Sequence, residues 1–71
     1  MAKRKGGEIP LSAIEKVMKK AGVKRASEGA KKLLRDYLEE IGIEISEKAI
    51  KLAEHGKRVT IRPEDIKLVS R

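Results

Sequence analysis

Apolar residues recur at helical spacing through most of this chain of 71 residues. The longest such run, residues 27–55, contains no proline, and its apolar positions advance by three or four residues each time. Ser27 is a suitable N-cap, and Gly56 follows as a stop signal. The pattern therefore predicts one long helix, whose apolar positions are Ala30, Leu33, Leu34, Tyr37, Leu38, Ile41, Ile45, Ala49, Leu52 and Ala53, widened by Ile43 and Ile50.

A shorter amphipathic helix is predicted over residues 10–21, with Pro10 at its start. Ser12 and Glu15 match a weak capping box, and Gly22 follows as a terminator. Its apolar face consists of Leu11, Ile14, Val17, Met18 and Ala21, where Met18 is most simply a core residue.

A third helix is predicted from Pro63 to about Ser70, with acidic residues in its first turn, where they complement the helix dipole. We expect it to bury Ile66, Leu68 and Val69. Residues 59–61 favour an extended conformation before it. The sequence thus predicts an all-α chain with a short helix, a long helix and a short helix.

The long helix is too long for a compact monomer of this size. Its 28 residues span about 42 Å, whereas a 71-residue globule has a radius of gyration of about 11 Å. Two short helices would leave much of its apolar surface in water, so we predict a dimer built along it. Gly42, near its middle, suits a two-fold crossing, although an exposed, tolerated glycine is the simpler alternative.

Basic residues gather at both flanks of the chain. The net charge of +7 divides into +6 for residues 1–25, −2 for residues 26–55 and +3 for residues 56–71. Such a distribution predicts a polyanionic partner that meets the loops and not the central helix. Lys24 and Arg25, beside a helix N-terminus, are typical of a phosphate cradle, although a simply exposed basic loop remains open.

Crossing two copies at Gly42 brings opposite ends of the long helices together. The Lys24 and Arg25 loop of one copy would then lie near the loop of residues 57–60 of the other. Several phosphate sites on one surface suit the backbone of a duplex.

The composition argues against several other classes. The chain has no cysteine and a single histidine, so we expect no catalytic residues, no metal site and no cofactor. Tyr37 is the sole aromatic residue, which disfavours a single-strand binder. The absence of Asn and Gln disfavours a sequence-specific helix-turn-helix protein. No signal-peptide or membrane-spanning pattern is present, so we expect a soluble cytoplasmic protein.

Several segments together resemble the archaeal histones. They are KRAS at 24–27, YLEEIG at 37–42, EKAIKLAEH at 47–55 and the RVTI and PEDI motifs within 58–66. The resemblance covers nearly all of residues 8–69 and implies the histone fold, an intertwined dimer that wraps double-stranded DNA in chromatin. We accordingly assign residues 1–8 to a basic flexible tail and residues 9–71 to a histone-fold domain.

The sequence pattern and the resemblance to the archaeal histones together give four groups of candidate site residues. The DNA-binding set is Lys16, Lys24, Arg25, Lys57, Arg58 and Thr60, and Arg58 is expected to pair with Asp65. The dimer core is Leu34, Tyr37, Leu38, Ile41, Gly42 and Ile45. The dimer–dimer interface is Leu52, His55, Asp65 and Leu68. Relatives often carry lysine after the residue that matches Arg58, where this chain has Val59, which removes one phosphate contact.

The expected function is sequence-independent binding and compaction of double-stranded DNA by a homodimer associated with the chromosome. Stacking of dimers into tetramers or longer, nucleosome-like assemblies is left open. The alternative is a protein-interaction module that pairs with another histone-fold chain in a transcription or chromatin complex.

Overall fold

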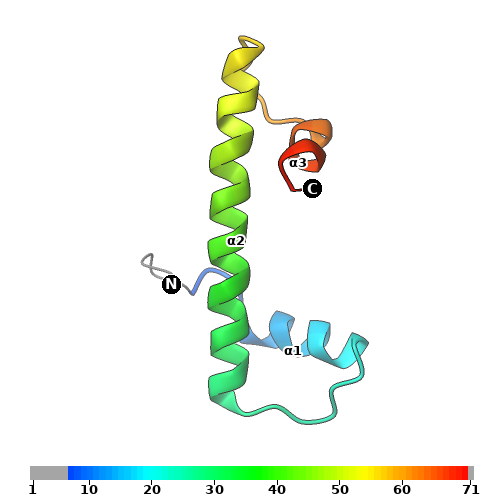
Figure 1. Ribbon diagram of the computed structural model, residues 1–71. Coiled ribbons are helices and arrows are strands. Elements are labelled where there is room, and N and C mark those ends of the chain that lie inside the picture. Colours follow the sequence, from blue (N-terminus) through cyan, green and yellow to red (C-terminus); the bar gives the residue numbers. More distant parts are fainter. Residues whose placement is uncertain (1–6, 71) are drawn as a thin grey trace. The chain divides into compact units, whose positions relative to one another are not determined.

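Three helices make up the fold in the computed structural model, which describes residues 7–70. Helix α1 spans Leu11–Lys20, α2 spans Glu28–His55 and α3 spans Pro63–Val69 (Figure 1). Residues 7–70 contain no strand, so the loop of residues 59–61 pairs with no other segment of this chain. The predicted all-α order of short, long and short helices is confirmed.

Helix α2 begins where its N-cap signal predicts. The Ser27 side-chain oxygen accepts a hydrogen bond from the Ala30 backbone N–H at 3.1 Å, which satisfies one of the free donors of the first turn. The helix then continues for 28 residues. Local capping therefore fixes the start of the longest element.

Helix α1 begins differently from the prediction. Pro10 is its N-cap and no side chain caps the first turn, so the predicted capping box of Ser12 and Glu15 is wrong. The residues that precede the helix are held by α2 instead. The Glu39 carboxylate accepts hydrogen bonds from the backbone N–H groups of Gly7 at 2.8 Å and Ile9 at 2.6 Å. A tertiary contact thus replaces the local cap.

Helix α1 ends as the sequence predicts. Gly22 has a φ of 101°, a left-handed conformation that glycine adopts without steric cost. The Gly22 N–H donates to the Lys19 carbonyl at 3.0 Å, and the Val23 N–H donates to the Met18 carbonyl at 3.0 Å. This pair of bonds is the Schellman motif, which satisfies the last carbonyls of the helix.

Helix α2 ends at His55, directly before Gly56 as the sequence predicts, but Gly56 is not the left-handed residue of the terminus. The left-handed residue is Lys57, with a φ of 58°, and Gly56 does not have a positive φ. The Lys57 N–H donates to the Glu54 carbonyl and the Arg58 N–H to the Ala53 carbonyl, each at 2.9 Å. The Schellman motif therefore places a lysine where glycine is usual.

The chain divides within α2 into two compact units, residues 1–40 and residues 41–71. In the first unit, Ile14 of α1 is buried, with 1% of its surface exposed. In the second, Ala49, Ala53 and Asp65 are buried. The buried apolar side chains of α2 in this unit are thus both alanines.

Many large apolar side chains stay exposed in the single chain. Ile66 and Leu68 of α3 are exposed in the single chain and Val69 is half-buried, so the expected burial of Ile66 and Leu68 is not met within one chain. Along α2, Tyr37, Leu38 and Ile41 are exposed, whereas Leu34 and Ile45 are half-buried. We call these five residues the α2 stripe. Within residues 7–70, no helix is long and apolar enough to cross a membrane.

The left-handed Lys57 predicts a stability change. Lys57→Gly should raise the free energy of unfolding by about 0.5–1 kcal/mol, because glycine removes the steric cost of a positive φ. The reverse change at the equivalent position of α1, Gly22→Lys, should lower it by about 1 kcal/mol. Urea unfolding of both variants at one protein concentration measures the two changes. A free energy of unfolding that shifts in the same direction in both variants would contradict the prediction.

Candidate nucleic-acid interface

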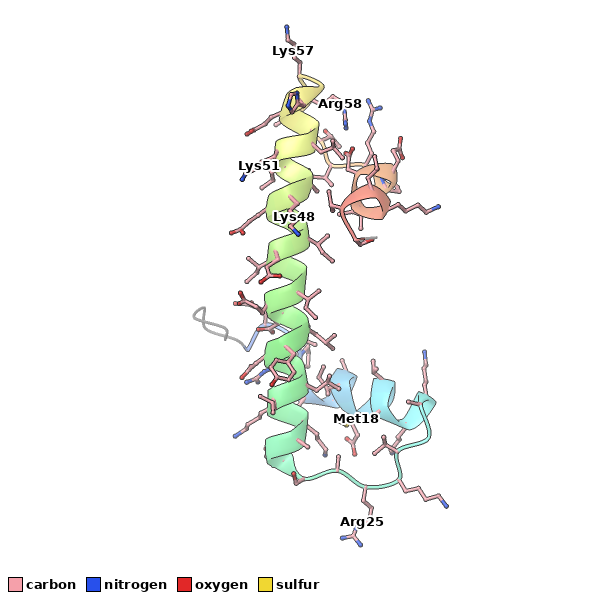
Figure 2. The ribbon with its side chains drawn as sticks, viewed as in Figure 1. Met18, Arg25, Lys48, Lys51, Lys57 and Arg58 are labelled. Carbon is pink, nitrogen blue, oxygen red and sulfur yellow. The ribbon has the colours of Figure 1, made fainter. Side chains whose placement is uncertain are left out.

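The loop between α1 and α2 presents two adjacent cations. Lys24 and Arg25 are both exposed, and Figure 2 shows the Arg25 side chain pointing away from the ribbon. They stand three and two residues before Ser27, the N-cap of α2. Backbone N–H groups at a helix N-terminus favour anions, so the loop combines two kinds of phosphate-binding group.

A hollow of about 210 Å³ adjoins this loop, between the end of α1 and the start of α2. Its lining includes apolar side chains, four cationic side chains and one carboxylate. The carboxylate of Glu15 forms an ion pair with the Lys31 ammonium at 3.6 Å. Lys19 and Lys31 join Lys24 and Arg25 in this lining. Sequence analysis missed both, because their helical positions gave no sign that they would meet at the loop. The lining residues are Glu15, Met18, Lys19, Val23, Lys24, Arg25, Ala26 and Lys31.

Lys16, the remaining DNA-binding candidate of the first unit, lies elsewhere on α1. It is exposed but does not line the hollow. Met18 is half-buried and contributes to the apolar part of the hollow, so its assignment as a simple core residue is only partly correct.

The loop between α2 and α3 is organised by one carboxylate. Asp65 accepts hydrogen bonds from both terminal nitrogens of Arg58, Nη1 at 2.9 Å and Nη2 at 3.0 Å. It also accepts a bond from the Arg62 backbone N–H at 2.8 Å. The Arg58 Nη1 donates further to the Thr60 carbonyl at 3.2 Å. Asp65 thereby fastens the chain on both sides of residues 59–61.

This pair differs from an ordinary surface ion pair. The Asp65 side chain is 4% exposed and that of Arg58 is 25% exposed, and bidentate geometry strengthens the contact. The Arg58 side chain, and then the Arg62 backbone N–H, lower the pKa of Asp65 to about 2, while the bond to Asp65 raises the pKa of Arg58. Three of about four acceptor positions of the carboxylate are occupied.

Lys57 precedes Arg58, and Thr60 lies between Arg58 and Arg62. Lys57 and Thr60 are both exposed, and Figure 2 shows Lys57 directed outward beyond the end of α2. The Thr60 carbonyl is engaged by Arg58, whereas its side chain is on the surface. The second loop therefore offers Lys57 as a freely directed cation and Arg58 as a cation already committed to Asp65.

The central helix also carries exposed lysines. Lys48 and Lys51 are labelled on α2 in Figure 2, and both are exposed. However, residues 26–55 contain seven acidic and five basic side chains, so the helix is net negative. The acidic side chains of the same helix therefore offset the charge of these lysines, unlike that of the cations of the two loops.

The candidate dimer–dimer residues have different exposures. Leu68 is 59% exposed and His55 is exposed, whereas Leu52 is half-buried. Asp65 is buried and holds the loop, so it offers a further partner only its remaining acceptor position. Gly42, the candidate crossing point, is open, because a Cβ added there would meet no atom within 4 Å.

The described residues contain no group of three or more histidine or acidic side chains that could hold a metal ion.

Comparison with known proteins identifies the family. Residues 7–69 match the family model described as histone-like transcription factor (CBF/NF-Y) and archaeal histone. The chain is 44% identical over 61 residues to one of the subunits of archaeal histone HAN1 from Thermococcus zilligii, covering 86% of this chain and 91% of the relative. It is also 44% identical over 64 residues to probable archaeal histone 3 of Methanocaldococcus jannaschii, covering 90% and 96%.

These matches define a DNA-binding protein of the chromatin class with the histone fold. The chain belongs to the family of histone-like transcription factors and archaeal histones.

The depressed pKa of Asp65 predicts a specific acid response. The ionised carboxylate stabilises the fold fully above its ordinary pKa of 3.8, and this contribution is lost as the pH falls through about 2. Asp65→Asn should therefore lower the melting temperature at pH 7, and the gap between variant and wild type should narrow from pH 4 to pH 2.

Glu64→Gln is the matched control, since Glu64 lies in the same first turn of α3 but is exposed. Melting curves across this pH range measure both variants. An Asp65→Asn gap that stays constant down to pH 2 contradicts the role assigned to the carboxylate.

Proposed function

We propose that the chain forms a histone-fold homodimer that binds double-stranded DNA through its phosphate backbone, without sequence preference, and compacts it. The role is architectural and requires no catalysis, cofactor or metal. The observation that carries the proposal is the combination of an exposed α2 stripe with exposed cations in the loops at both ends of α2.

The α2 stripe is the surface that a second copy covers. Tyr37, Leu38 and Ile41 are 41%, 38% and 51% exposed, and Ile41 follows the other two by four and three residues, the spacing of one helix face. Burial of apolar area contributes about 25 cal/mol per Å², so leaving this face in water costs stability that a partner helix recovers. The stripe therefore supports an interface along α2.

Gly42 is the crossing point of the two copies. It lies 14 residues after Glu28 and 13 residues before His55, and its open surface leaves room for the partner helix. With a two-fold axis at this point, the first loop of each copy lies next to the second loop of the other. A dimer then carries two paired cationic edges.

Each cationic edge binds the DNA backbone. Lys24 and Arg25 of one copy and Lys57 of the other supply direct phosphate contacts, and Lys16 extends the same surface. Arg58 holds the second loop in shape through Asp65, and Thr60 presents its side chain from that loop. Contacts of this kind position a duplex without reading its sequence.

Dimers associate further through Leu52, His55, Asp65 and Leu68. Leu68 supplies exposed apolar surface and His55 an exposed imidazole, while the buried Asp65 holds the adjoining loop in shape. This surface allows tetramers or longer, nucleosome-like stacks on DNA.

Residues 1–8 are assigned to the basic tail of the 9–71 domain. The Gly7 N–H donates a hydrogen bond to Glu39. Lys3, Arg4 and Lys5 lie outside the described residues.

A different histone-fold chain would cover the α2 stripe equally well. The relative from Thermococcus zilligii is named as one of the subunits of an archaeal histone, which makes pairing between unlike chains the second candidate. Oligomer measurements on the chain alone separate the two.

Dimer formation predicts a concentration-dependent stability. The melting temperature of the chain alone should rise with protein concentration, because association stabilises only the folded state. Ile41→Glu should abolish the folded dimer, since it places a charge in the apolar face. Lys32→Glu places the same carboxylate at an exposed position of α2 ten residues from Gly42 and should leave the dimer intact. A folded monomer in analytical ultracentrifugation contradicts the interface, and folding only with another chain supports the heterodimer.

Phosphate binding predicts a steep salt dependence. The logarithm of the association constant for duplex DNA should fall linearly with the logarithm of salt concentration, by about 0.9 for each phosphate neutralised. The double variant Lys24→Gln, Arg25→Gln should weaken binding about tenfold or more and flatten this slope. The effect should be the same on duplexes of different sequence.

The matched control is the double variant Lys48→Gln, Lys51→Gln, which removes the same charge from the shaft of α2. It should change the slope little, because these lysines lie outside the two edges. Equal effects of the two double variants would show that overall charge, and not the loops, governs binding.

A further inference from the structure

Val59 is the most exposed of the large apolar side chains that the structure describes. It is 97% exposed, whereas the others are at most 59% exposed. It lies outside the α2 stripe, in the loop between α2 and α3. The interface proposed for the dimer core therefore does not account for it.

The exposure of Val59 does not come from a loose loop. Asp65 binds the Arg58 side chain before Val59 and the Arg62 backbone N–H after it. The Arg58 N–H is also fixed to the Ala53 carbonyl at 2.9 Å. The loop is fastened on both sides, so it holds the isopropyl group of Val59 outward.

The surroundings of Val59 are cationic. Lys57 and Arg58 precede it and Arg62 follows it, and residues 56–71 carry a net charge of +3. In the proposed dimer, the first loop of the other copy lies next to this segment, and its Lys24 and Arg25 add to the positive charge around Val59. A polyanion complements this setting, and it must also offer apolar surface to the isopropyl group.

We propose that Val59 inserts into the minor groove of double-stranded DNA and packs on the deoxyribose walls while the neighbouring cations hold phosphate. This inference rests on the proposed DNA binding and adds an apolar contact to it. Duplex DNA presents sugar C–H surface between two rows of phosphates, and apolar side chains are used by proteins as contacts in this groove.

An apolar contact has a salt dependence different from that of a cation. A lysine at this position would release counterions, whereas valine gains affinity by removing apolar surface from water. Val59 therefore contributes affinity that persists as salt rises. This separates its role from that of the loop cations.

The first test is Val59→Thr, which keeps the β-branched shape and replaces a methyl group by a hydroxyl. Titrations of a labelled duplex at several salt concentrations should show binding weakened about three- to tenfold at every concentration, with the salt slope unchanged. Because Val59 is exposed, the melting temperature should not change. Equal affinities of the variant and the wild type overturn the inference.

Val59→Lys is the second test. It should steepen the salt slope by about 0.9 for each copy that contacts phosphate. Ser46→Lys, an exposed position on α2, adds the same charge away from the loop and should leave the slope nearly unchanged. A slope change of equal size in both variants overturns the position assigned to Val59.

Groove location is tested by filling the minor groove with netropsin. The difference between wild type and Val59→Thr should then vanish, and a difference that persists overturns the minor-groove assignment. Altered self-association of Val59→Thr without DNA instead assigns Val59 to a protein interface and overturns the inference. A wild-type salt slope near zero rejects the proposed function itself, whereas a steep slope with no effect of Val59→Thr rejects only the role of Val59.

Discussion

A helix of 28 residues presents more apolar surface than two short helices within one chain cover, and this constraint governs the molecule. The buried apolar side chains among residues 7–70 are Ile14 in one unit and Ala49 and Ala53 in the other. Tyr37 and Ile41 remain exposed near the middle of α2. In the proposed homodimer the second copy would complete the core, which would make dimerisation part of folding.

The second constraint is electrostatic and is centred on Asp65. Burying a charged carboxylate is unfavourable unless it is paired and hydrogen-bonded. Here the Arg58 guanidinium and the Arg62 backbone N–H supply these bonds. The same contacts shape the loop that carries Lys57 and Val59. Arg58 thus uses its hydrogen-bonding groups within the chain, which distinguishes it from Arg25, whose side chain points away from the ribbon (Figure 2).

The helices could be predicted because periodicity and capping are local properties. Ser27 starts α2 and Gly22 terminates α1 through hydrogen bonds to close neighbours in the chain, so their signals are readable in the sequence. The errors fall where other groups compete with the expected ones. Glu39 holds the start of α1 in place of the expected Ser12 cap, and Lys57, not the glycine before it, adopts the left-handed conformation at the end of α2.

The sequence by itself determined the number, order and approximate extent of the helices, the apolar faces and the charge of the flanks, because these depend on residues close together in the chain. Tertiary structure alone decided which groups meet. It brought Lys19 and Lys31 to the hollow beside the first loop, and it left Ile66 exposed on α3. It also fastened the second loop so that Val59 points outward, since contacts between separate elements depend on how whole helices pack.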